Sequence, residues 1–374
     1  MLRYLTSGES HGKCMLAILD GMPAGLLIDK SSIDMELSRR MAGYGRGKRM
    51  KIESDKVEIL SGLRKSKTIG SPIAMMVKNV DQSIDRLPVV VEPRPGHADL
   101  TGALKYGTKD IRDVLERSSA RETVARVSVG AVAKQLLSEF GIKITSHVTI
   151  IGSIESKAKG LGFSQIVTMS ERSPVRCADP NASILMCKEI DKALSAGDTL
   201  GGMFEVIIKG TPPGLGSYAQ WDRKIDARLA MAIISIQAIK AVSFGMGFEF
   251  ATRKGSSVHD EIFYDKSKGF YRKTNNAGGI EGGMTNGEDI VISAVMKPIS
   301  TLRKPLSSVN IKTRKKALAA VERADACAVS AAGVIGEAVS AIEIASAMLE
   351  KFGGDSVAEM RRNYEGYITQ VRKF

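Results

Sequence analysis

Hydrophobic and polar positions alternate with two different periods along the chain, and each period indicates a kind of element. Near the start, apolar positions on both sides of a polar turn at residues 8–12 predict two strands joined by that turn. Helical spacing of apolar residues predicts helices over residues 31–41, 121–140, 188–196, 222–241, 310–323 and 329–352. The stretch 222–241 is the longest of low polarity, and it places Gln237 inside a helix.

Strand patterns and long polar segments fill the remainder. Strands are predicted at 57–63 and 73–77 as a hairpin, and over 142–154, 197–210 and 289–296. Residues 79–90 and 155–182 read as irregular polar segments. Residues 251–287 are glycine-rich and without clear period, and a loop of that length inside a compact protein is commonly functional.

Composition narrows the class of protein. With 374 residues, 43% of them hydrophobic, the chain can build a sizeable core in one large domain or two. We see no apolar run of the ~18 residues that a membrane helix needs, and no signal peptide, so no membrane partner and a cytoplasmic location are expected. The four cysteines are scattered without metal-ligand spacing, which predicts reduced thiols and no metal site.

The net charge of +13 favours an anionic partner but does not identify it. Aromatic residues are only 5% of the chain and no RNA-binding signature is present, so an anionic small molecule is favoured over nucleic acid. A basic RNA- or polyphosphate-binding protein without catalysis remains the alternative. It would explain the charge and lysines such as those at 312–316, but it would not need the histidines discussed next.

The stretch 91–123 concentrates groups able to bind and protonate an anion. Its turn formers, Pro93, Pro95 and Gly96, predict a loop that presents His97. Residues 117–119 are expected just before or at a helix N-terminus, where backbone N–H groups favour an anion. The structural alternatives are a helix cap beside a surface arginine, and a turn histidine satisfied by Asp99.

The turn at residues 8–12 reads GESHG and fits the G-x-S-x-G spacing of a hydrolase nucleophile elbow. A serine hydrolase using Ser10 is therefore a second alternative. An elbow follows a central strand, however, and here only seven residues precede the motif. Outside that role, glycines flanking Ser10 and His11 let the backbone approach a ligand closely. Residues 39–49 add a glycine-rich basic loop with Arg40 and Arg46.

Several of these motifs occur in an order that resembles one family over residues 7 to about 355. They are GESHG (8–12), GYGRG (43–47), RPGHAD (94–99), ERSSARET (116–123), Gln237-Ala238, NNAGGIEGG (275–283), KPIST (297–301) and ERADACAV (322–329). On these motifs the chain resembles the chorismate synthase family.

The resemblance implies an activity and a fold. The family is a lyase that converts 5-enolpyruvylshikimate 3-phosphate to chorismate by 1,4-anti-elimination of phosphate, the last step of the shikimate pathway of aromatic amino acid biosynthesis. It requires reduced FMN without net redox change, with NADPH as an indirect electron source. The implied structure is α+β, a single domain over residues 1–374 with helices sandwiched between antiparallel β-sheets, assembled as a homotetramer in the cytoplasm.

The resemblance also implies roles for particular residues. His11 would protonate the leaving phosphate, His97 would lie by flavin N1 and O2, and Asp325 with Ser10 or Ser119 would help proton removal at flavin N5. The implied FMN contacts are Arg117, Ser118, Ser119, Gln237, Ala238, Asn275, Gly282, Lys297, Pro298, Ile299, Ser300, Thr301 and Arg323. The implied substrate contacts are Ser10, Arg40, Arg46, Arg94 and Arg121, of which Arg40 and Arg46 are also family positions for NADP contact.

The residues and the implied chemistry agree. The substrate carries one phosphate and two carboxylates, and FMN adds another phosphate. Clustered arginines suit these anionic groups because a guanidinium binds a phosphate or carboxylate through two parallel hydrogen bonds. A histidine is suited to protonating a leaving phosphate near neutral pH.

Overall fold

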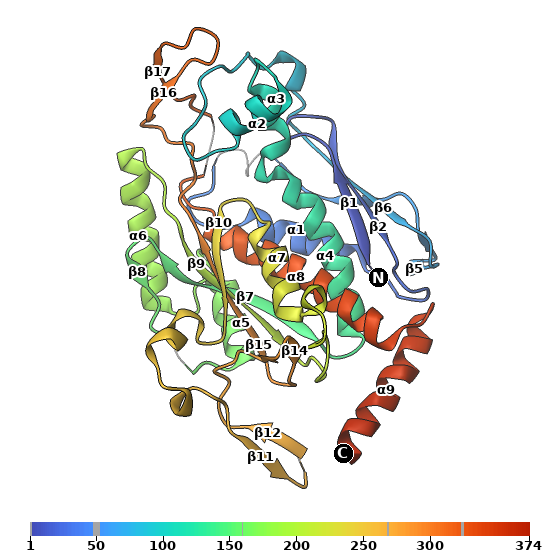
Figure 1. Cartoon of the computed structure of the whole chain (residues 1–374). Coiled ribbons are helices and arrows are strands. Elements are labelled where there is room, and N and C mark those ends of the chain that lie inside the picture. Colours follow the sequence, from blue (N-terminus) through green and yellow to red (C-terminus); the bar gives the residue numbers. More distant parts are fainter. Residues whose placement is uncertain (1, 48–52, 159, 268, 323–324) are drawn as a thin grey trace.

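The computed structural model describes residues 2–47, 53–158, 160–267, 269–322 and 325–374 (Figure 1). Its α-helices are α1 (Lys30–Met41), α2 (Asp99–Tyr106), α3 (Arg112–Ser118), α4 (Thr123–Ser138), α5 (Phe163–Arg172), α6 (Pro180–Ala196), α7 (Ile225–Ile234), α8 (Val329–Phe352) and α9 (Val357–Lys373). Short hairpins pair β4 (Leu63–Arg64) with β5 (Lys67–Thr68), β11 (Ile262–Asp265) with β12 (Gly269–Arg272), β13 (Ile280–Glu281) with β14 (Met284–Thr285), and β16 (Ser307–Val309) with β17 (Lys316–Leu318).

The other strands form two sheets. The first has the order β1-β2-β6-β3, from β1 (Arg3–Ser7), β2 (Cys14–Asp20), β3 (Val57–Ile59) and β6 (Ile73–Lys78). The second has the order β10-β15-β9-β7-β8, from β7 (Lys143–Ile151), β8 (Ile154–Glu155), β9 (Gly202–Lys209), β10 (Ile239–Phe244) and β15 (Ile290–Met296). The neighbouring strands in both sheets pair antiparallel, so the chain has the mixed helix and antiparallel-sheet character that we predicted.

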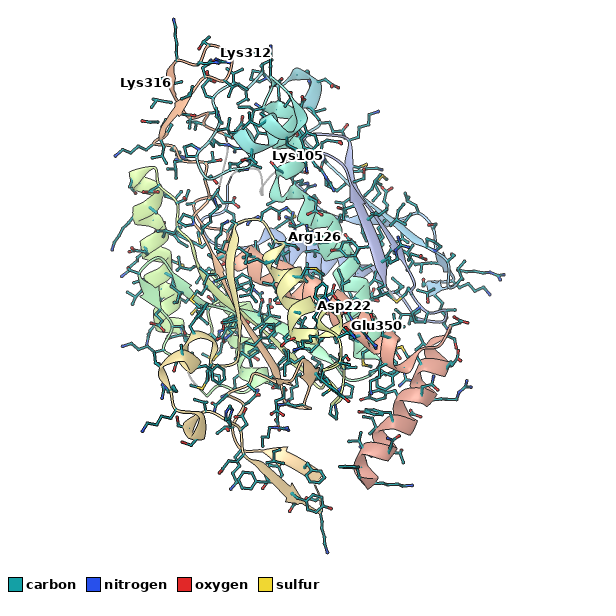
Figure 2. The ribbon with its side chains drawn as sticks, viewed as in Figure 1. Lys105, Arg126, Asp222, Lys312, Lys316 and Glu350 are labelled. Atoms are coloured by element: carbon teal, nitrogen blue, oxygen red, sulfur yellow. The ribbon has the colours of Figure 1, made fainter. Side chains whose placement is uncertain are left out.

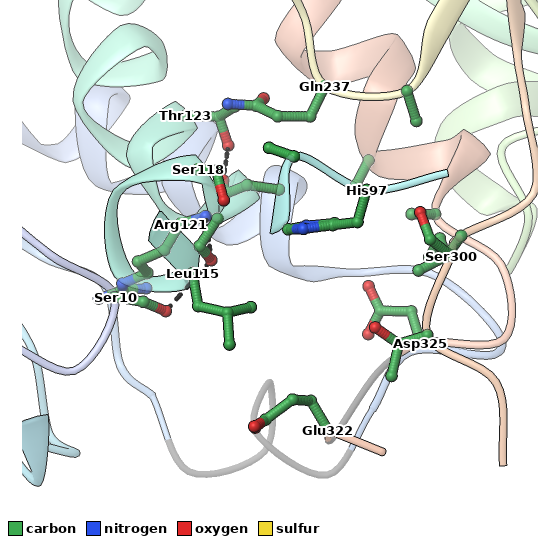
Figure 3. A pocket seen from close by; sticks show the side chains of 18 of the residues that line it. Ser10, His97, Leu115, Ser118, Arg121, Thr123, Gln237, Ser300, Glu322 and Asp325 are labelled. Carbon is green, nitrogen blue, oxygen red and sulfur yellow. Dashed lines mark hydrogen bonds between the residues drawn. The ribbon is translucent and has the colours of Figure 1, made fainter. Parts of the chain in front are cut away.

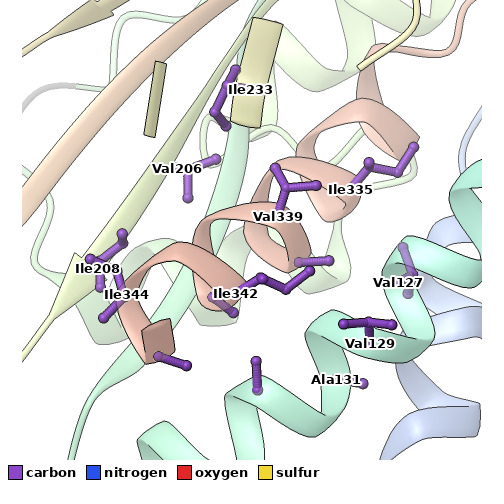
Figure 4. Close-up of a cluster of buried hydrophobic side chains, with 14 of the residues drawn as sticks. Val127, Val129, Ala131, Val206, Ile208, Ile233, Ile335, Val339, Ile342 and Ile344 are labelled. Carbon is purple, nitrogen blue, oxygen red and sulfur yellow. The ribbon is translucent and has the colours of Figure 1, made fainter. Parts of the chain in front are cut away.

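Helices α4 and α8 pack against each other at the centre of the molecule (Figure 1). On its other side α4 contacts strands β1, β2 and β6, and α8 contacts β7 and β9. Figure 4 shows Ile335, Val339 and Ile342 of α8 next to Val127 and Val129 of α4. These side chains are 5% exposed or less. Their removal from water is the main stabilising contribution in this region, at about 25 cal/mol per Å² of apolar surface.

Helix α8 corrects one expectation from the sequence. We saw no run long and apolar enough to cross a membrane, yet α8 meets that test by length and hydropathy. It is 94% buried inside the protein, however, and contacts α1, α4, α7 and both β7 and β9. Its apolar character is therefore that of a core helix surrounded by protein on every side.

The contact between α4 and α8 depends on Gly130. A Cβ atom at this position would lie 2.5 Å from both Cα and Cβ of Ala338. Alanine is the better helix former by about 1 kcal/mol, but overpacking a core costs about 1–3 kcal/mol. Because the clash involves backbone that cannot rotate away, we expect Gly130→Ala to lower the free energy of unfolding, as measured by chemical denaturation.

Gly366 in α9 provides the matched control, since a Cβ there would meet no atom within 4 Å. We expect Gly366→Ala to raise the free energy of unfolding by up to about 1 kcal/mol. A Gly130→Ala protein as stable as the parent would contradict the close helix contact.

One predicted helix is too long and another is wrong. Helix α7 ends at Ile234, and the rest of the predicted helix 222–241 turns at Ala238, whose φ is +68°, into strand β10. Pairing with β15 takes precedence over helical spacing there. In the predicted helix 310–323, Asn310 accepts hydrogen bonds from the backbone N–H groups of Lys312 and Thr313 and starts the turn of the β16–β17 hairpin.

Lys312 and Lys316 are exposed on the β16–β17 hairpin, as Figure 2 shows. A solvated face is the ordinary environment of such a lysine cluster, so these lysines do not by themselves indicate a nucleic-acid partner.

Other helices were not predicted, or were predicted too short. The stretch 91–123, expected as a loop leading into one helix, contains α2 and α3. The segment predicted as irregular, 155–182, contains α5, whose buried Ile166 packs with Phe163 and Met169 at a helical spacing that we did not recognise. Helix α6 begins at Pro180 with Asp179 as its N-cap, eight residues before our predicted start of 188. The glycine-rich segment 251–287 holds the hairpins β11–β12 and β13–β14.

The other predicted elements are confirmed. They are the strands β1 and β2 around the GESHG turn, helices α1 and α4, the β3–β6 pairing, strands β7, β9 and β15, and helix α8 with the bounds we expected. All four cysteines are free thiols, as predicted.

Candidate active site

A cavity of about 750 Å³ opens where the β1–β2 turn, the stretch 91–123, the start of β10, the segment after β15 and the start of α8 meet. Sixteen residues singled out from the sequence line it: Ser10, His11, Arg40, Arg46, Arg94, His97, Ser118, Ser119, Arg121, Gln237, Ala238, Lys297, Ile299, Ser300, Thr301 and Asp325. In Figure 3, Ser10, Ser118 and Arg121 lie on one side and Ser300 and Asp325 on the other, with His97 between them.

His11 is held by a buried carboxylate. Its Nδ1 lies 2.9 Å from Oε1 of Glu116 on α3, and its backbone N–H donates to Oε2 of the same group at 2.7 Å. Gly8 has a φ of +109°, and a Cβ there would lie 2.2 Å from the carbonyl oxygen of Cys14, so the β1–β2 turn that carries His11 requires glycine at this position. Burial raises the pKa of Glu116, but the hydrogen bonds from His11 outweigh burial and hold this pKa below its usual value. Glu116 is therefore ionised at neutral pH.

His97 has a similar partner on its own loop. Its Nδ1 lies 2.5 Å from Oδ1 of Asp99, and Arg94 donates to both carboxylate oxygens of Asp99 through its backbone N–H, Nε and Nη2. Arg94 also donates to Oγ1 of Thr301 at 2.7 Å, which joins this loop to the segment after β15. Burial raises the pKa of Asp99, but the hydrogen bonds from His97 and Arg94 dominate and place this pKa well below its usual range. The structural alternative from the sequence, in which Asp99 is the partner of His97, is therefore observed. His97 lines the cavity at the same time.

The lowered pKa of Asp99 predicts a pH-dependent effect of Asp99→Asn. Because the folded pKa lies below the unfolded value of about 4, the stabilisation is complete above that pH and is lost as pH falls through the folded pKa. We expect Asp99→Asn to lower the free energy of unfolding at pH 7 by about 1.5–3 kcal/mol. The difference from the parent should shrink below about pH 4 in denaturation curves.

The exposed Asp222 supplies the control for that experiment. Asp222→Asn should leave the stability curve unchanged. A difference between Asp99→Asn and the parent that stays constant down to pH 2 would contradict the assignment to this carboxylate.

Two buried arginines form the deep end of the cavity. Arg40 on α1 donates to Oδ2 of Asp55 at 2.8 Å, and Nη1 of Arg121 lies 2.7 Å from Oδ1 of the same carboxylate. Arg121 also donates from Nε to the side-chain oxygen of Asn79. Burial lowers the pKa of Arg40 to about 10, with Asp55 opposing that effect and Arg121 adding to it. Arg40 therefore remains cationic at neutral pH, and both guanidinium groups line the cavity.

Asp325 lies on the opposite wall. It accepts a hydrogen bond from the backbone N–H of Gly47 at 2.6 Å, and its Oδ2 lies 3.0 Å from Nη1 of Arg46. Ser10 donates to Ser119 at 3.1 Å, which connects the first sheet's turn to the start of the ERSSARET helix region. Only Ser119 of the predicted 117–119 anion site caps a helix, since Arg117 and Ser118 end α3 instead.

The segment after β15 contributes polar and cationic groups, as the sequence predicted. Lys297 and Ser300 both donate to the carbonyl oxygen of Gly96, which fixes this segment against the His97 loop. Burial lowers the pKa of Lys297, and the neighbouring Lys240 adds to the effect. Two lysines on one wall are suited to a phosphate group.

Apolar side chains and two buried polar atoms complete the cavity. Its apolar wall comes from Ile234, Ile236, Ala328, Ala331, Ala332 and Ile335. Among the described residues, Oγ of Ser118 and Oε1 of Gln237 are buried and have no hydrogen-bond partner. A buried polar atom without a partner is costly, so both atoms fit a ligand that has an apolar body and polar edges.

Some predicted site residues lie elsewhere. Arg117 donates to the carbonyl oxygens of Gly8 and Thr6 and does not line the cavity. Pro298 is not part of the wall either, although its neighbours are. Arg323 falls outside the described residues.

Asn275 and Gly282 also lie away from the wall. Asn275 donates to the carbonyl oxygen of Asp289 and accepts from the backbone N–H of Gly279, so it organises its own loop. Gly283, next to Gly282, accepts from the backbone N–H of Ile225 at the start of α7. The ten residues of α7 span about 15 Å, and Gln237 follows the far end. The flavin role of Asn275 and Gly282 stays a prediction.

Several cavity residues were not assigned a role from the sequence. Glu116, Arg112, Glu322 and Lys240 all line the wall. Arg112 donates to Glu322 at 2.8 Å and lies 3.9 Å from Glu116. Glu116 and Arg112 stand in the stretch that we singled out, and their i,i+4 spacing was the available signal. Among the described residues no cluster of ligating side chains could hold a metal, and none was predicted.

The fold and this cavity, lined by histidines and arginines, are consistent with an enzyme that acts on a small molecule. The family model of chorismate synthase matches residues 2–349. The chain therefore belongs to the chorismate synthase family.

Individual relatives are similar in sequence to this chain over the whole length of both chains. The chain is 54% identical to chorismate synthase of Geobacter metallireducens and 55% identical to that of Pelobacter propionicus, with 100% of both chains covered in each comparison. It is also similar to a crystal structure of chorismate synthase, with a TM-score of 0.84 and 44% identity over 100% of this chain and 99% of that one.

Proposed function

We propose that this lyase converts 5-enolpyruvylshikimate 3-phosphate to chorismate. The C–O bond to phosphate breaks with its electron pair on the phosphate oxygen, a proton leaves the ring, and a new C=C bond forms. The observation that carries the proposal is that His11, His97 and five arginines, far apart in sequence, line one cavity. That set provides charge neutralisation for the anions and proton donors for a leaving group.

Different residues of the chain bind the substrate and transfer protons. Arg40, Arg46, Arg94 and Arg121 bind and orient the phosphate and carboxylates. His11 gives a proton to the departing phosphate and is protonated again from solvent. Asp325 on one wall, and Ser10 or Ser119 on the opposite wall, help to move the ring proton away.

The cavity also fits reduced FMN. The apolar wall suits a flat ring system, the unsatisfied Oγ of Ser118 and Oε1 of Gln237 suit its polar edge, and Lys297 with Ser300 and Thr301 suits its phosphate. His97 would lie by flavin N1 and O2. When bound, reduced FMN supplies transient electron density that weakens the C–O bond and recovers it, so there is no net redox change.

The cavity fits NADPH less well than it fits the substrate and FMN. Arg40 is 3% exposed and bound to Asp55, a setting that fits a small substrate better than a second nucleotide. We therefore propose NADPH only as an indirect source of electrons, acting before FMN is bound.

The remaining properties extend the family's pattern to this chain. The layer order of sheet, α4, α8 and sheet supports the family's sandwich of helices between antiparallel sheets, built as one domain over residues 1–374. A homotetramer located in the cytoplasm, without a membrane or nucleic-acid partner, completes the proposal.

Steady-state assays test the proposal against its alternatives. Under anaerobic conditions we expect phosphate release from 5-enolpyruvylshikimate 3-phosphate with reduced FMN and none with oxidised FMN. Nucleic-acid binding with a steep salt dependence and no turnover would favour the non-catalytic alternative. A hydrolase should be labelled at Ser10 by a fluorophosphonate, and we expect no labelling because the GESHG turn joins two antiparallel strands rather than a strand and a helix.

A further inference from the structure

Glu116 contacts the β1–β2 turn at three points. Its carboxylate oxygens receive the backbone N–H and lie against the imidazole of His11, and its backbone carbonyl accepts from the N–H of Ser10 at 2.9 Å. The side chain of Glu116 is 3% exposed, whereas that of His11 is 20% exposed on the cavity side. One buried carboxylate thus fixes both the backbone and the ring of the same histidine.

This arrangement selects between the two ring nitrogens. With Nδ1 turned to a carboxylate at 2.9 Å, a proton on Nδ1 is stabilised and Nε2 is the nitrogen turned away from Glu116. A protonated ring can then release its Nε2 proton and remain hydrogen-bonded through Nδ1–H.

We propose that Glu116 is a positioning residue that holds His11 as the proton donor to the leaving phosphate, an inference that rests on the proposed function. Among the described residues, few charged groups lie around Glu116. His11 faces it from the turn and Arg112 from its own helix, Glu322 pairs with the far side of Arg112, and Asp81 lines the same cavity. His11 is the nearest cation partner among them, since Arg112 lies 3.9 Å away and shares its charge with Glu322.

Glu116→Gln tests the role because it keeps the side-chain volume and one acceptor oxygen while removing the charge. We expect kcat to fall about 10–100-fold, with KM for the substrate and the affinity for FMN within about threefold of the parent. Glu116→Asp keeps the charge and should recover part of the rate.

Two controls separate positioning from simple stabilisation. Asp113→Asn changes an exposed carboxylate on the same helix and should leave kcat and its pH profile unchanged. In the background His11→Ala, adding Glu116→Gln should lower kcat by less than about twofold, because residues that act as a unit are not additive.

A spectroscopic measurement gives an answer without turnover. The chain has four histidines, so ¹⁵N-histidine labelling yields few signals, and His11 is identified by its loss in His11→Ala. We expect the parent to keep the proton on Nδ1 near neutral pH and Glu116→Gln to move toward the Nε2–H tautomer. Unchanged tautomer and kcat in Glu116→Gln would overturn the inference, whereas a parent protein that makes no chorismate would remove the proposed function instead.

Discussion

Replacing His11 by alanine is expected to lower kcat by about 10²–10⁴-fold, the usual contribution of a positioned general acid. His11 lines the cavity, is held through Nδ1 by Glu116, and stands on the same wall as Ser10 and Ser119. Without it, phosphate must leave unprotonated and the barrier rises. The affinity for FMN should change little, because the apolar wall and Gln237 lie on other elements.

Stability must be measured alongside, since the substitution also removes a partner of a buried carboxylate. Loss of that partner costs about 1–3 kcal/mol, which is too little to unfold a typical protein but enough to shift its denaturation midpoint. A His11→Ala protein that is folded, binds FMN and turns over at the parent's rate would exclude His11 as the proton donor.

The largest expected loss of stability follows from Glu337→Gln. Glu337 lies on α8 with 0% exposure and accepts hydrogen bonds from Arg39, Lys134, Arg176 and Ser146. Burial raises the pKa of Glu337, but the three cations outweigh burial and hold this pKa well below its usual value. Glu36 and Glu171 complete a network that ties together α1, α4, α5 and α8.

Removing one charge from that network leaves three cations with two carboxylates. Breaking a buried ion pair by removing one partner costs about 3–5 kcal/mol, and we expect Glu337→Gln to lower the free energy of unfolding by this amount in chemical denaturation. Glu350 on the same helix is the control, because its ion pair with Arg228 is more exposed and Arg228 keeps Glu343. Glu350→Gln should cost no more than about 1 kcal/mol, and equal losses in both variants would contradict the buried network.

The sequence predicted the fold best where the hydrophobic pattern suited only one kind of element. Helix α8 has apolar or small residues on every face and stops at two glycines, so its bounds were predictable. The pattern after Ile234 was ambiguous, because residues 235–241 suit a helix as well as a strand. Pairing of β10 with β15 decides that case, and such pairing is not a property of the local sequence. Gln237 therefore lies in a turn at the cavity rather than inside a helix.

The sequence predicted individual residues of the candidate site but not which of them contact one another. Motifs around His11, His97 and Asp325 pointed to chemistry because of their residue types and their resemblance to a family. The carboxylate behind His11 could not be assigned, since Glu116 meets it only when α3 packs beside the β1–β2 turn. For the same reason the outward position of Arg117 was not predicted, as its contacts to Thr6 and Gly8 cross more than 100 residues.

A single-turnover reaction tests the central claim most directly. Protein, chemically reduced FMN and 5-enolpyruvylshikimate 3-phosphate are mixed anaerobically in equal amounts, and phosphate, chorismate absorbance and the flavin spectrum are followed together. We expect phosphate and chorismate in a 1:1 ratio, with FMN still reduced at the end. Phosphate without chorismate, or chorismate formed equally well with oxidised FMN, would contradict the account.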